Sequence, residues 1–252
     1  METIELPAAT RCAILVGDYG SGKTEIAVNL ALCLVEEGRV AHVGGRVAIA
    51  DLDLVNPYFR CREVAEPLVQ AGIRVVIPQG GHRFADLPIL LPQVKGLLQD
   101  DDHVAILDVG GDEVGSRVLA GLAPTFRPEV HELWFVVNAN RPFNDTPEGC
   151  VETIRRIERA SNLRVSGLVS NTHLMQETTA EMVVLGAALT ETVAGMLDVP
   201  VRAVAIMASL VDHVLVSHPV LRMRRLMVPP WLRRPSTPHQ HQRPDMFRLH
   251  SA

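Results

Sequence analysis

The sequence predicts an α/β fold with a doubly wound, mainly parallel sheet of about seven strands and helices on both faces. Short apolar runs alternate with helix-length segments along most of the 252 residues, which is the pattern of successive strand–helix units. Hydrophobic residues make up 47% of the chain, so a chain of this length can bury a full central sheet. We predict one domain over residues 1–231, followed by a disordered tail over the Pro-, His-, Gln- and Arg-rich residues 232–252.

Each strand is predicted from a short apolar run, and each helix from apolar residues that recur on one helical face. The expected strands are residues 12–17, 46–51, 73–78, 103–108, 132–138, 164–170 and 201–206. The expected helices are residues 23–37, 60–71, 113–122, 146–161 and 178–196, with a shorter one near 209–216. Residues 40–45 are interpreted as extra sequence before the second strand, most simply a surface hairpin.

The net charge, the N-terminal residues and the cysteines indicate which partners and which compartment to expect. The net charge is −5, which does not indicate nucleic-acid binding. The N-terminus lacks the basic and apolar regions of a signal peptide, and no apolar run reaches the roughly 18 residues of a spanning helix, so we expect a cytoplasmic protein without membrane contact. The four cysteines are far apart in the chain, which favours buried thiols in a reducing compartment and leaves open one metal site shared between two subunits. They are Cys12, Cys33, Cys61 and Cys150.

Residues 17–24 match the phosphate-loop pattern G-x-x-x-x-G-K-[ST] in full. They read Gly17, Asp18, Tyr19, Gly20, Ser21, Gly22, Lys23 and Thr24. A predicted strand precedes the loop and a predicted helix follows it, which is the order that phosphate binding by backbone N–H groups and a helix N-terminus requires. The chain contains only two lysines, so a lysine here indicates a compact ammonium reaching between phosphates, while the Thr24 hydroxyl can ligate Mg²⁺. The predicted ligand is a nucleoside triphosphate.

Carboxylates follow two of the predicted strands. Asp51 and Asp53 lie at the end of the second strand, and Asp108 ends the fourth. Ligands of open α/β sheets bind at this edge, where one carboxylate can hold a magnesium-bound water and another can orient the water that attacks the γ-phosphate. Gly111, in Asp-x-x-Gly, can present a backbone N–H to that phosphate. For Asp51 and Asp53 alone, ordinary solvated turn chemistry is the alternative.

The base-reading end is predicted at Asn171, which follows the sixth strand. A guanine-specific site would carry an aspartate at position 174, where this chain has Leu174. The Asn171 amide offers both a donor and an acceptor to an adenine edge, so ATP is favoured over GTP. A simple capping role for Asn171 is the alternative.

These motifs, in this order, resemble those of the MinD/ParA-like (CobQ/CobB/MinD/ParA) branch of P-loop NTPases, over about residues 10–220. The resemblance implies that Lys23 and Asp53 are catalytic, with Asp53 positioning water. It also implies that Thr24 is the direct Mg²⁺ ligand, with Asp51 and Asp108 as outer-sphere partners. One departure matters: MinD and ParA proteins carry a second, signature lysine just after the first loop glycine, where this chain has Asp18. Coupling of hydrolysis to dimerisation through that lysine is therefore not implied here.

The sequence thus predicts a Mg²⁺-dependent ATP-binding and hydrolysing switch that acts on a protein partner and turns over slowly without it. A homodimer remains open. Two alternatives also remain: a small-molecule kinase or ligase of the dethiobiotin-synthetase type, and a nucleotide-binding module without turnover. Two further features have no assigned role. One is Arg141, which follows the fifth strand and could contact a phosphate or a partner, or lie on the surface without a role. The other is the basic stretch 222–234, whose apolar residues are expected to pack on the body of the protein, with a docking strip for an acidic partner or a membrane surface as the alternative.

Overall fold

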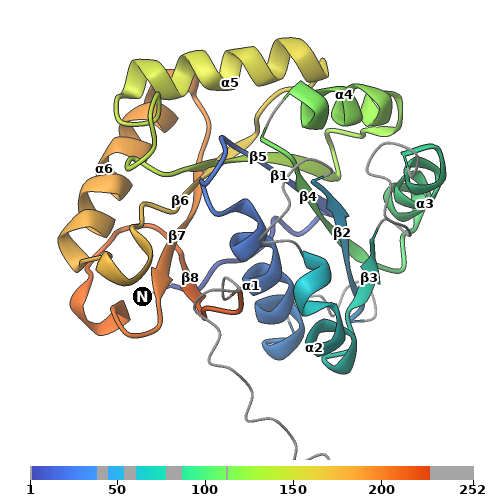
Figure 1. Ribbon diagram of the computed structural model, residues 1–252, viewed down its shortest axis with the longest axis horizontal. Coiled ribbons are helices and arrows are strands. Elements are labelled where there is room, and N and C mark those ends of the chain that lie inside the picture. The colour runs from blue at the N-terminus through green and yellow to red at the C-terminus, as the bar shows by residue number, and fades with distance from the viewer. Residues whose placement is uncertain (1, 39–44, 54–60, 78–86, 112, 228–252) are drawn as a thin grey trace, which may run out of the picture.

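An eight-stranded sheet forms the centre of the protein, and all its neighbouring strands pair in parallel. The computed structural model describes residues 2–38, 45–53, 61–77, 87–111 and 113–227. The strand order is β3-β2-β4-β1-β5-β6-β7-β8, which Figure 1 shows as an arc of arrows. The strands are β1 (Cys12–Val16), β2 (Val47–Leu52), β3 (Arg74–Val76), β4 (Val104–Val109), β5 (His131–Val137), β6 (Gly167–Ser170), β7 (Val201–Met207) and β8 (Val220–Met223).

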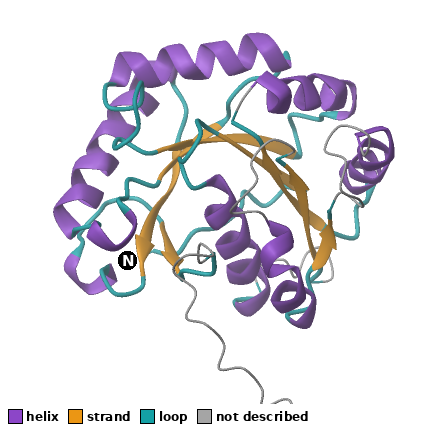
Figure 2. Ribbon diagram, in the orientation of Figure 1, coloured by secondary structure: helices purple, strands orange, loops and turns teal. Residues whose placement is uncertain are grey.

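Helices cover both faces of the sheet, as Figure 2 shows. The α-helices are α1 (Lys23–Glu36), α2 (Ala65–Gln70), α3 (Leu87–Gln99), α4 (Glu113–Leu122), α5 (Pro147–Ser161) and α6 (Ala180–Leu197). One hydrophobic cluster joins α1 and α2 to one face of the sheet. A second joins the other face to α3, α4, α5 and α6. A fully buried parallel sheet needs this cover on both sides, because neither face has polar side chains to present to water.

Side-chain alternation along β2 and β4 decides where their carboxylates lie. In β2, Val47 and Ile49 face the α1 cluster, and in β4, Val104 and Ile106 do so. Because alternate residues of a strand share a face, Asp51 and Asp108 continue these two rows onto the α1 side of the sheet. The first turn of α1 begins at Lys23, so the strand periodicity alone brings the acidic side chains to the same side as the lysine of the loop.

The predicted architecture is confirmed, with one more strand than expected. All seven predicted strands and the five long predicted helices are present to within a few residues, although the segment 60–71 divides into a 3₁₀ turn (Cys61–Val64) and α2. Strand β8 and helix α3 were missed. The short helix expected near 209–216 is a 3₁₀ turn, Val211–His213. The hairpin expected over 40–45 falls almost entirely outside the described residues, and so does the predicted tail over 232–252.

The basic stretch begins inside the edge strand β8, of which Arg222 and Met223 are the last two residues. Leu221, Met223 and Met227 are buried, whereas Arg222 is exposed. The expected packing of the apolar residues on the body is therefore confirmed up to residue 227. Arg224 binds this segment to α1, because its N–H donates to Asn29 Oδ1 at 2.7 Å and its guanidinium lies 2.7 Å from Glu36 Oε1.

Helix α6 is the most apolar of the long helices. Among the described segments it alone is long and apolar enough, by length and composition, to cross a membrane. In this structure it packs against β6, β7 and α5. Its buried residues, such as Val183 and Val193, belong to the hydrophobic clusters of the sheet.

Candidate functional site

The loop between β1 and α1 lies at the carboxyl edge of the sheet, where the strand order reverses on either side of β1. Its last glycine, Gly22, has φ 86°, in the left-handed region, and caps α1. A Cβ atom at this position would lie 2.3 Å from Asn171 Nδ2. Both the backbone angle and the space therefore require glycine. Helix α1 begins directly after this glycine, and a helix N-terminus favours anions.

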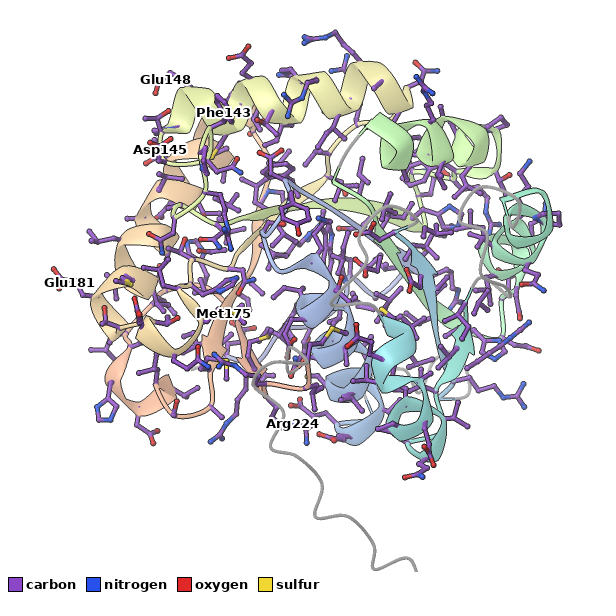
Figure 3. All side chains as sticks on the ribbon, in the orientation of Figure 1. Phe143, Asp145, Glu148, Met175, Glu181 and Arg224 are labelled. Atoms are coloured by element: carbon purple, nitrogen blue, oxygen red, sulfur yellow. The ribbon has the colours of Figure 1, made fainter. Side chains whose placement is uncertain are left out.

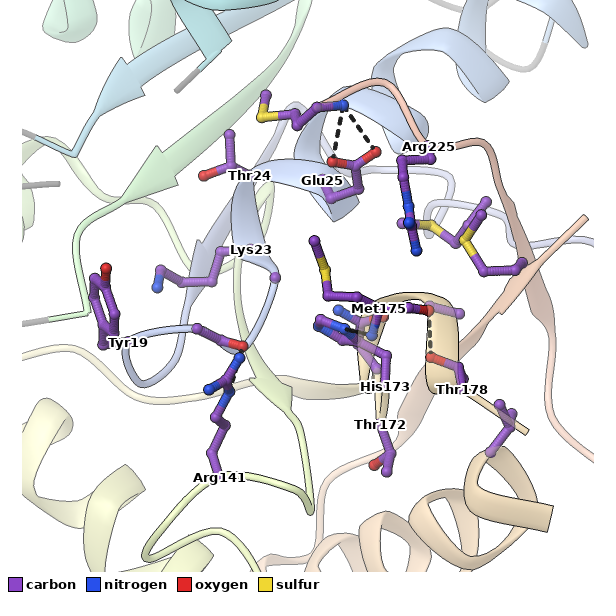
Figure 4. A pocket seen from close by; sticks show the side chains of 18 of the residues that line it. Tyr19, Lys23, Thr24, Glu25, Arg141, Thr172, His173, Met175, Thr178 and Arg225 are labelled. Atoms are coloured by element: carbon purple, nitrogen blue, oxygen red, sulfur yellow. Dashed lines mark hydrogen bonds between the residues drawn. The ribbon is translucent and has the colours of Figure 1, made fainter. Parts of the chain in front are cut away.

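Lys23 is nearly buried, with 6% of its surface exposed. Its Nζ donates a hydrogen bond to the backbone oxygen of Asp18 at 3.2 Å, so the side chain curls back across the loop, as Figure 4 shows. Gly111 packs closely against the same region, since an added Cβ would lie 2.3 Å from Gly17 O and 3.0 Å from Lys23 Nζ. The predicted switch glycine and the loop lysine are thus neighbours in the fold.

The three predicted carboxylates gather beside this lysine. Asp51 and Asp108 are opposite each other in the β2–β4 register, and both are fully buried. Asp53 lies just beyond the end of β2, is 7% exposed, and donates its backbone N–H to Asp51 Oδ1 at 3.1 Å. Carboxylates this deeply buried need nearby positive charge.

The raised pKa of Asp108 shows that the protein alone does not supply enough positive charge to keep this carboxylate ionised. Burial, followed by the negative charge of Asp51, raises the pKa of Asp108 from its usual 3.8 to about 7. The Thr24 hydroxyl and the Lys23 ammonium act in the opposite direction and only partly offset this rise. A divalent cation beside the two carboxylates would stabilise their ionised forms, so the donor set of Asp51, Asp108 and Thr24 fits Mg²⁺.

Three polar side chains hold the phosphate loop from outside: Asn171, which was predicted at the base end, Arg141, for which a phosphate or partner contact was left open, and Asn138, which was not predicted. Asn171 Nδ2 donates to Ser21 O at 2.8 Å, so the amide positions the loop, and its predicted contact with adenine stays a prediction. Arg141 Nε donates to Gly20 O at 3.0 Å, and Asn138 Nδ2 donates to the same oxygen at 3.4 Å. Asn138 is the first polar residue after β5, and this change from apolar to polar at a strand end was the available signal.

Asp18 takes part in a separate set of contacts. Its carboxylate accepts a hydrogen bond from Asn144 Nδ2 at 2.8 Å and lies 3.3 Å from an Arg156 guanidinium nitrogen. The side chain is 17% exposed. Phe143, next to Asn144, has φ 68° and is 72% exposed, and it lies near the start of α5 in Figure 3. The charge at the position of the signature lysine is therefore directed to α5 and paired there.

A cavity of about 340 Å³ extends from the loop toward β7 and β8. We call residues 17–24 with Asp51, Asp53 and Asp108 the phosphate end of the site. The opposite wall, which we call the methionine end, is formed by Met175, Met207, Met223 and Met227. Met175, labelled in Figures 3 and 4, comes from the segment after β6. Thioethers are polarisable and adaptable, and they pack well against flat aromatic rings.

His173 lies between the two ends of the cavity. Burial, followed by the positive charges of Arg141 and Arg225, lowers its pKa to about 4. The imidazole is therefore neutral near pH 7, with one ring nitrogen as donor and the other as acceptor. Such a side chain can bond the edge of a heterocyclic base without adding charge. No sequence motif indicated it, because its role depends on packing against residues distant in the chain.

The structure brings the predicted site residues to one edge of the sheet: the phosphate loop, the three aspartates, Gly111 and Asn171. Tyr19 is the exception in orientation, since 72% of its side chain is exposed, although it forms part of the cavity rim. The residues that prediction missed come from the segments after β5 and β6 and from β8.

Comparisons with known proteins support the fold. No protein-family model matches the sequence, and no curated protein matches it. The structure is similar to that of signal recognition particle 54 kDa protein from Aeropyrum pernix K1 in complex with GDP, with a TM-score of 0.53, 21% identity, and coverage of 79% of this chain and 42% of that one. It is also similar to FtsY from Mycoplasma mycoides, with a TM-score of 0.50, 15% identity, and coverage of 80% and 62%.

The chain thus spans less than two thirds of the length of either protein. At these identities the similarity shows the fold alone. The protein has an α/β fold of the P-loop NTPase kind, with helices on both faces of a parallel sheet.

Proposed function

We propose that this protein binds ATP with Mg²⁺ at the phosphate end of the site and hydrolyses it slowly, as a switch that acts on a protein partner. The observation that carries the proposal is the convergence of Lys23, Thr24 and Asp53 on one cavity, which is large enough for a nucleotide. Buried Asp108 lies behind this wall, where Thr24 and Lys23 act on its carboxylate. Phosphoryl transfer is catalysed mainly by positioning and electrostatic stabilisation, and these groups supply both.

Each residue of the phosphate end has a role in this proposal. Thr24 would ligate Mg²⁺ directly, with Asp51 and Asp108 holding it through water, and the ion would neutralise charge that develops on the transferred phosphate. Lys23 Nζ exchanges its bond to Asp18 O for one to a phosphate oxygen. Asp53 orients the attacking water. The backbone N–H of Gly111 can bond the γ-phosphate and lose that bond after hydrolysis, which gives the switch its two states.

The methionine end favours a purine and, between purines, adenine. Guanine recognition commonly uses a carboxylate that accepts from the base edge. Among the residues that the structure describes, two carboxylates line the cavity, Asp53 at the phosphate end and Glu25. The Glu25 carboxylate already accepts from Leu226 N at 2.6 Å and from Met227 N at 3.3 Å. Neutral His173 already accepts at Nδ1 from Met175 N at 3.4 Å, so its Nε2–H is the group left to donate to a ring nitrogen of the base.

We place the protein in the MinD/ParA-like branch. Asp18 indicates that its switch differs from that of the MinD and ParA dimers, in which a signature lysine reaches the partner subunit's nucleotide. A carboxylate paired with Arg156 inside its own subunit cannot replace a lysine that reaches the partner subunit's nucleotide. Turnover is therefore slow in the isolated protein and is stimulated by a different protein. We propose the cytoplasm as its location, with no nucleic-acid partner and no membrane contact.

Two variants and one control test the proposal. Lys23→Ala removes the ammonium from the phosphates, so it should abolish ATP binding. Lys95→Ala removes the only other lysine, which lies on α3 away from the site, and should bind as the wild type does. Asp53→Ala should retain binding and lose phosphate release. Binding is measured by calorimetric titration with ATP and GTP in Mg²⁺, and hydrolysis by phosphate release.

Three results would point elsewhere. Equal hydrolysis by Lys23→Ala and Asp53→Ala would remove the assigned roles. Turnover that appears only when a metabolite is added would favour the small-molecule kinase or ligase. Nucleotide binding without turnover under any partner condition would favour a passive module.

A further inference from the structure

Residues 223–227, which we call the strap, run from the end of β8 along helix α1 and present alternate side chains to the cavity. Met223, Arg225 and Met227 line the cavity. Leu226, between two of them, packs against the hydrophobic cluster that contains α1. This alternation is that of an extended chain, in which neighbouring side chains point in opposite directions. The strap therefore has one row of side chains for the cavity and another for the helix.

Two side chains of α1 bind the backbone of the strap. Asn29 accepts a hydrogen bond from Arg224 N at 2.7 Å and donates one to Arg224 O at 3.0 Å. Glu25 accepts from Leu226 N at 2.6 Å and from Met227 N at 3.3 Å, and dashed lines mark its contact in Figure 4. Residues four apart lie on the same face of a helix, so one face of α1 fixes the strap at two points.

The strap and the Glu25 carboxylate stabilise each other. Burial raises the pKa of Glu25, while the hydrogen bonds from Leu226 and Met227 and the charge of Arg225 act against this rise. A carboxylate withdrawn from water needs such donors to stay ionised. The second anchor, Asn29, is 2% exposed, so its amide also depends on its bonds to the strap. Loss of either anchor should therefore loosen the strap.

The row of side chains that faces the cavity suits a flat heterocyclic ring. The thioethers of Met223 and Met227 pack well against aromatic rings, and a guanidinium such as that of Arg225 can stack on a base. Met175 lines the same cavity from the segment after β6, and Figure 4 shows it on a different segment from Arg225. A base at this end would thus contact side chains from two separate parts of the chain.

We propose that the strap packs on the base of the bound nucleotide, and that Glu25 and Asn29 are the positioning residues that hold it there. This inference rests on the proposed function, because the strap can contact a base only if a nucleotide occupies the cavity. Glu25 directly follows Thr24, the proposed Mg²⁺ ligand, so the first turns of α1 serve both ends of the site. The ligand class that follows is a nucleoside triphosphate in preference to a bare polyphosphate.

Hydrogen exchange of the full chain without ligand tests the anchors. The amides of Leu226 and Met227 should be protected in the wild type. Glu25→Gln replaces one acceptor oxygen with an NH₂ group and removes the charge, so these two amides should exchange about tenfold faster. Glu36→Gln is the matched control: Glu36 Oε1 also contacts the strap, 2.7 Å from Arg224, but both side chains are about half exposed. Such pairs contribute little, so wild-type exchange is expected.

Calorimetric titration in Mg²⁺ with ATP and with inorganic tripolyphosphate separates the base from the phosphates. Both ligands reach the phosphate end, whereas only ATP reaches the strap. Glu25→Gln and Asn29→Ala should each weaken ATP binding by about tenfold and change tripolyphosphate binding by less than about twofold. Glu36→Gln should bind both ligands as the wild type does. Thermal melting shows that each variant is folded.

The outcomes separate this inference from the proposed function. Wild-type ATP affinity in Glu25→Gln, or slow exchange of Leu226 and Met227 in that variant, would overturn the role of the anchors. Equal losses of ATP and tripolyphosphate affinity would overturn it too, because Glu25 would then act through the phosphate loop. A wild type that binds neither ligand would instead remove the proposed function, and with it the contact between the strap and a base.

Discussion

The two ends of the cavity are built in different ways. The phosphate end depends on backbone shape and buried charge: a left-handed glycine, a nearly buried lysine, and two carboxylates with 0% exposure. The methionine end consists of flexible thioethers and one neutral imidazole. The first can hold only one kind of group, because its N–H groups and charges have fixed directions. The second can adapt to a flat apolar surface, because Met side chains change rotamer at low cost.

The two ends also differ in how far apart their residues lie in the sequence. Eight consecutive residues and the ends of two strands, β2 and β4, form the phosphate end. The methionine end combines the segment after β6 with the last residue of β7, the last residue of β8 and the residues that follow β8. Substitutions should therefore have large and specific effects at the phosphate end and smaller, graded effects at the methionine end.

The largest effect is expected at Gly22. Alanine would hold an L side chain at φ 86° and place its Cβ 2.3 Å from Asn171 Nδ2. The strain and the lost Asn171 bond to Ser21 O should together reduce ATP affinity by about a thousandfold, or about 4 kcal/mol. Calorimetric titration measures the affinity. Gly195→Ala, at an open position of α6, should bind normally and gain about 0.5–1 kcal/mol of stability. Tight ATP binding by Gly22→Ala would mean that the loop geometry is not required.

A second effect comes from the raised pKa of Asp108. Because the folded pKa of about 7 exceeds the usual 3.8, the folded protein holds an extra proton between these values. The free energy of unfolding should therefore fall as pH rises through this range, by about 3 kcal/mol between pH 5 and 8 from this group.

Urea unfolding of Asp108→Asn checks this prediction. The variant should gain stability relative to the wild type from pH 5 to pH 8, since asparagine cannot ionise. Asp102→Asn, at a largely exposed position, should follow the wild-type curve. Parallel curves for Asp108→Asn and the wild type would show that Asp108 is ionised throughout.

The methionine end should respond to pH in the opposite direction. The folded pKa of His173 is about 4, below its usual 6.5, so the stability it contributes is present above pH 6.5 and is lost as pH falls toward 4. For this partly buried ring we expect a loss of about 2 kcal/mol. The difference in unfolding free energy between the wild type and His173→Gln measures it. Exposed His213→Gln is the control, and an equal response of both variants would contradict the prediction.

The same division explains what the sequence could predict. The phosphate loop, Asp51, Asp53 and Asp108 were predicted because each belongs to a short local pattern with a known position at a strand end. The fold was predicted because the periodicity of a buried parallel sheet is strong. Strand β8 was missed because Pro219 and the surrounding arginines resemble an irregular segment, although Leu221 and Met223 alternate with exposed Arg222 as an edge strand requires.

Contacts between distant segments could not be predicted. Cys61 lies 47 residues from Asp108 in the chain, and Arg156 lies 138 residues from Asp18. Each pair meets only because the strand order places β2 beside β4 and α5 near the loop. Helix α3 was missed for a different reason: Pro92 lies inside it, and proline argues against a helix interior.

The smallest expected effect is at Asp18, where the phosphate end carries a charge that should disfavour phosphate. Arg156 partly neutralises this charge, but its side chain is 63% exposed, so solvent weakens the pair. Asp18→Asn keeps an oxygen to accept from Asn144 and removes the charge. We expect ATP affinity to rise about twofold to fivefold at low salt, and less at high salt.

Arg156→Gln provides the opposing test, because it removes the neutralising cation and leaves the carboxylate in place. ATP affinity should fall by a similar factor, and added salt should again reduce the change. Titrations of both variants at two salt concentrations separate charge from shape. Equal, salt-independent decreases in the two variants would mean that the Asp18–Arg156 pair acts by holding the loop in position, and that the field of its carboxylate does not reach the bound phosphates.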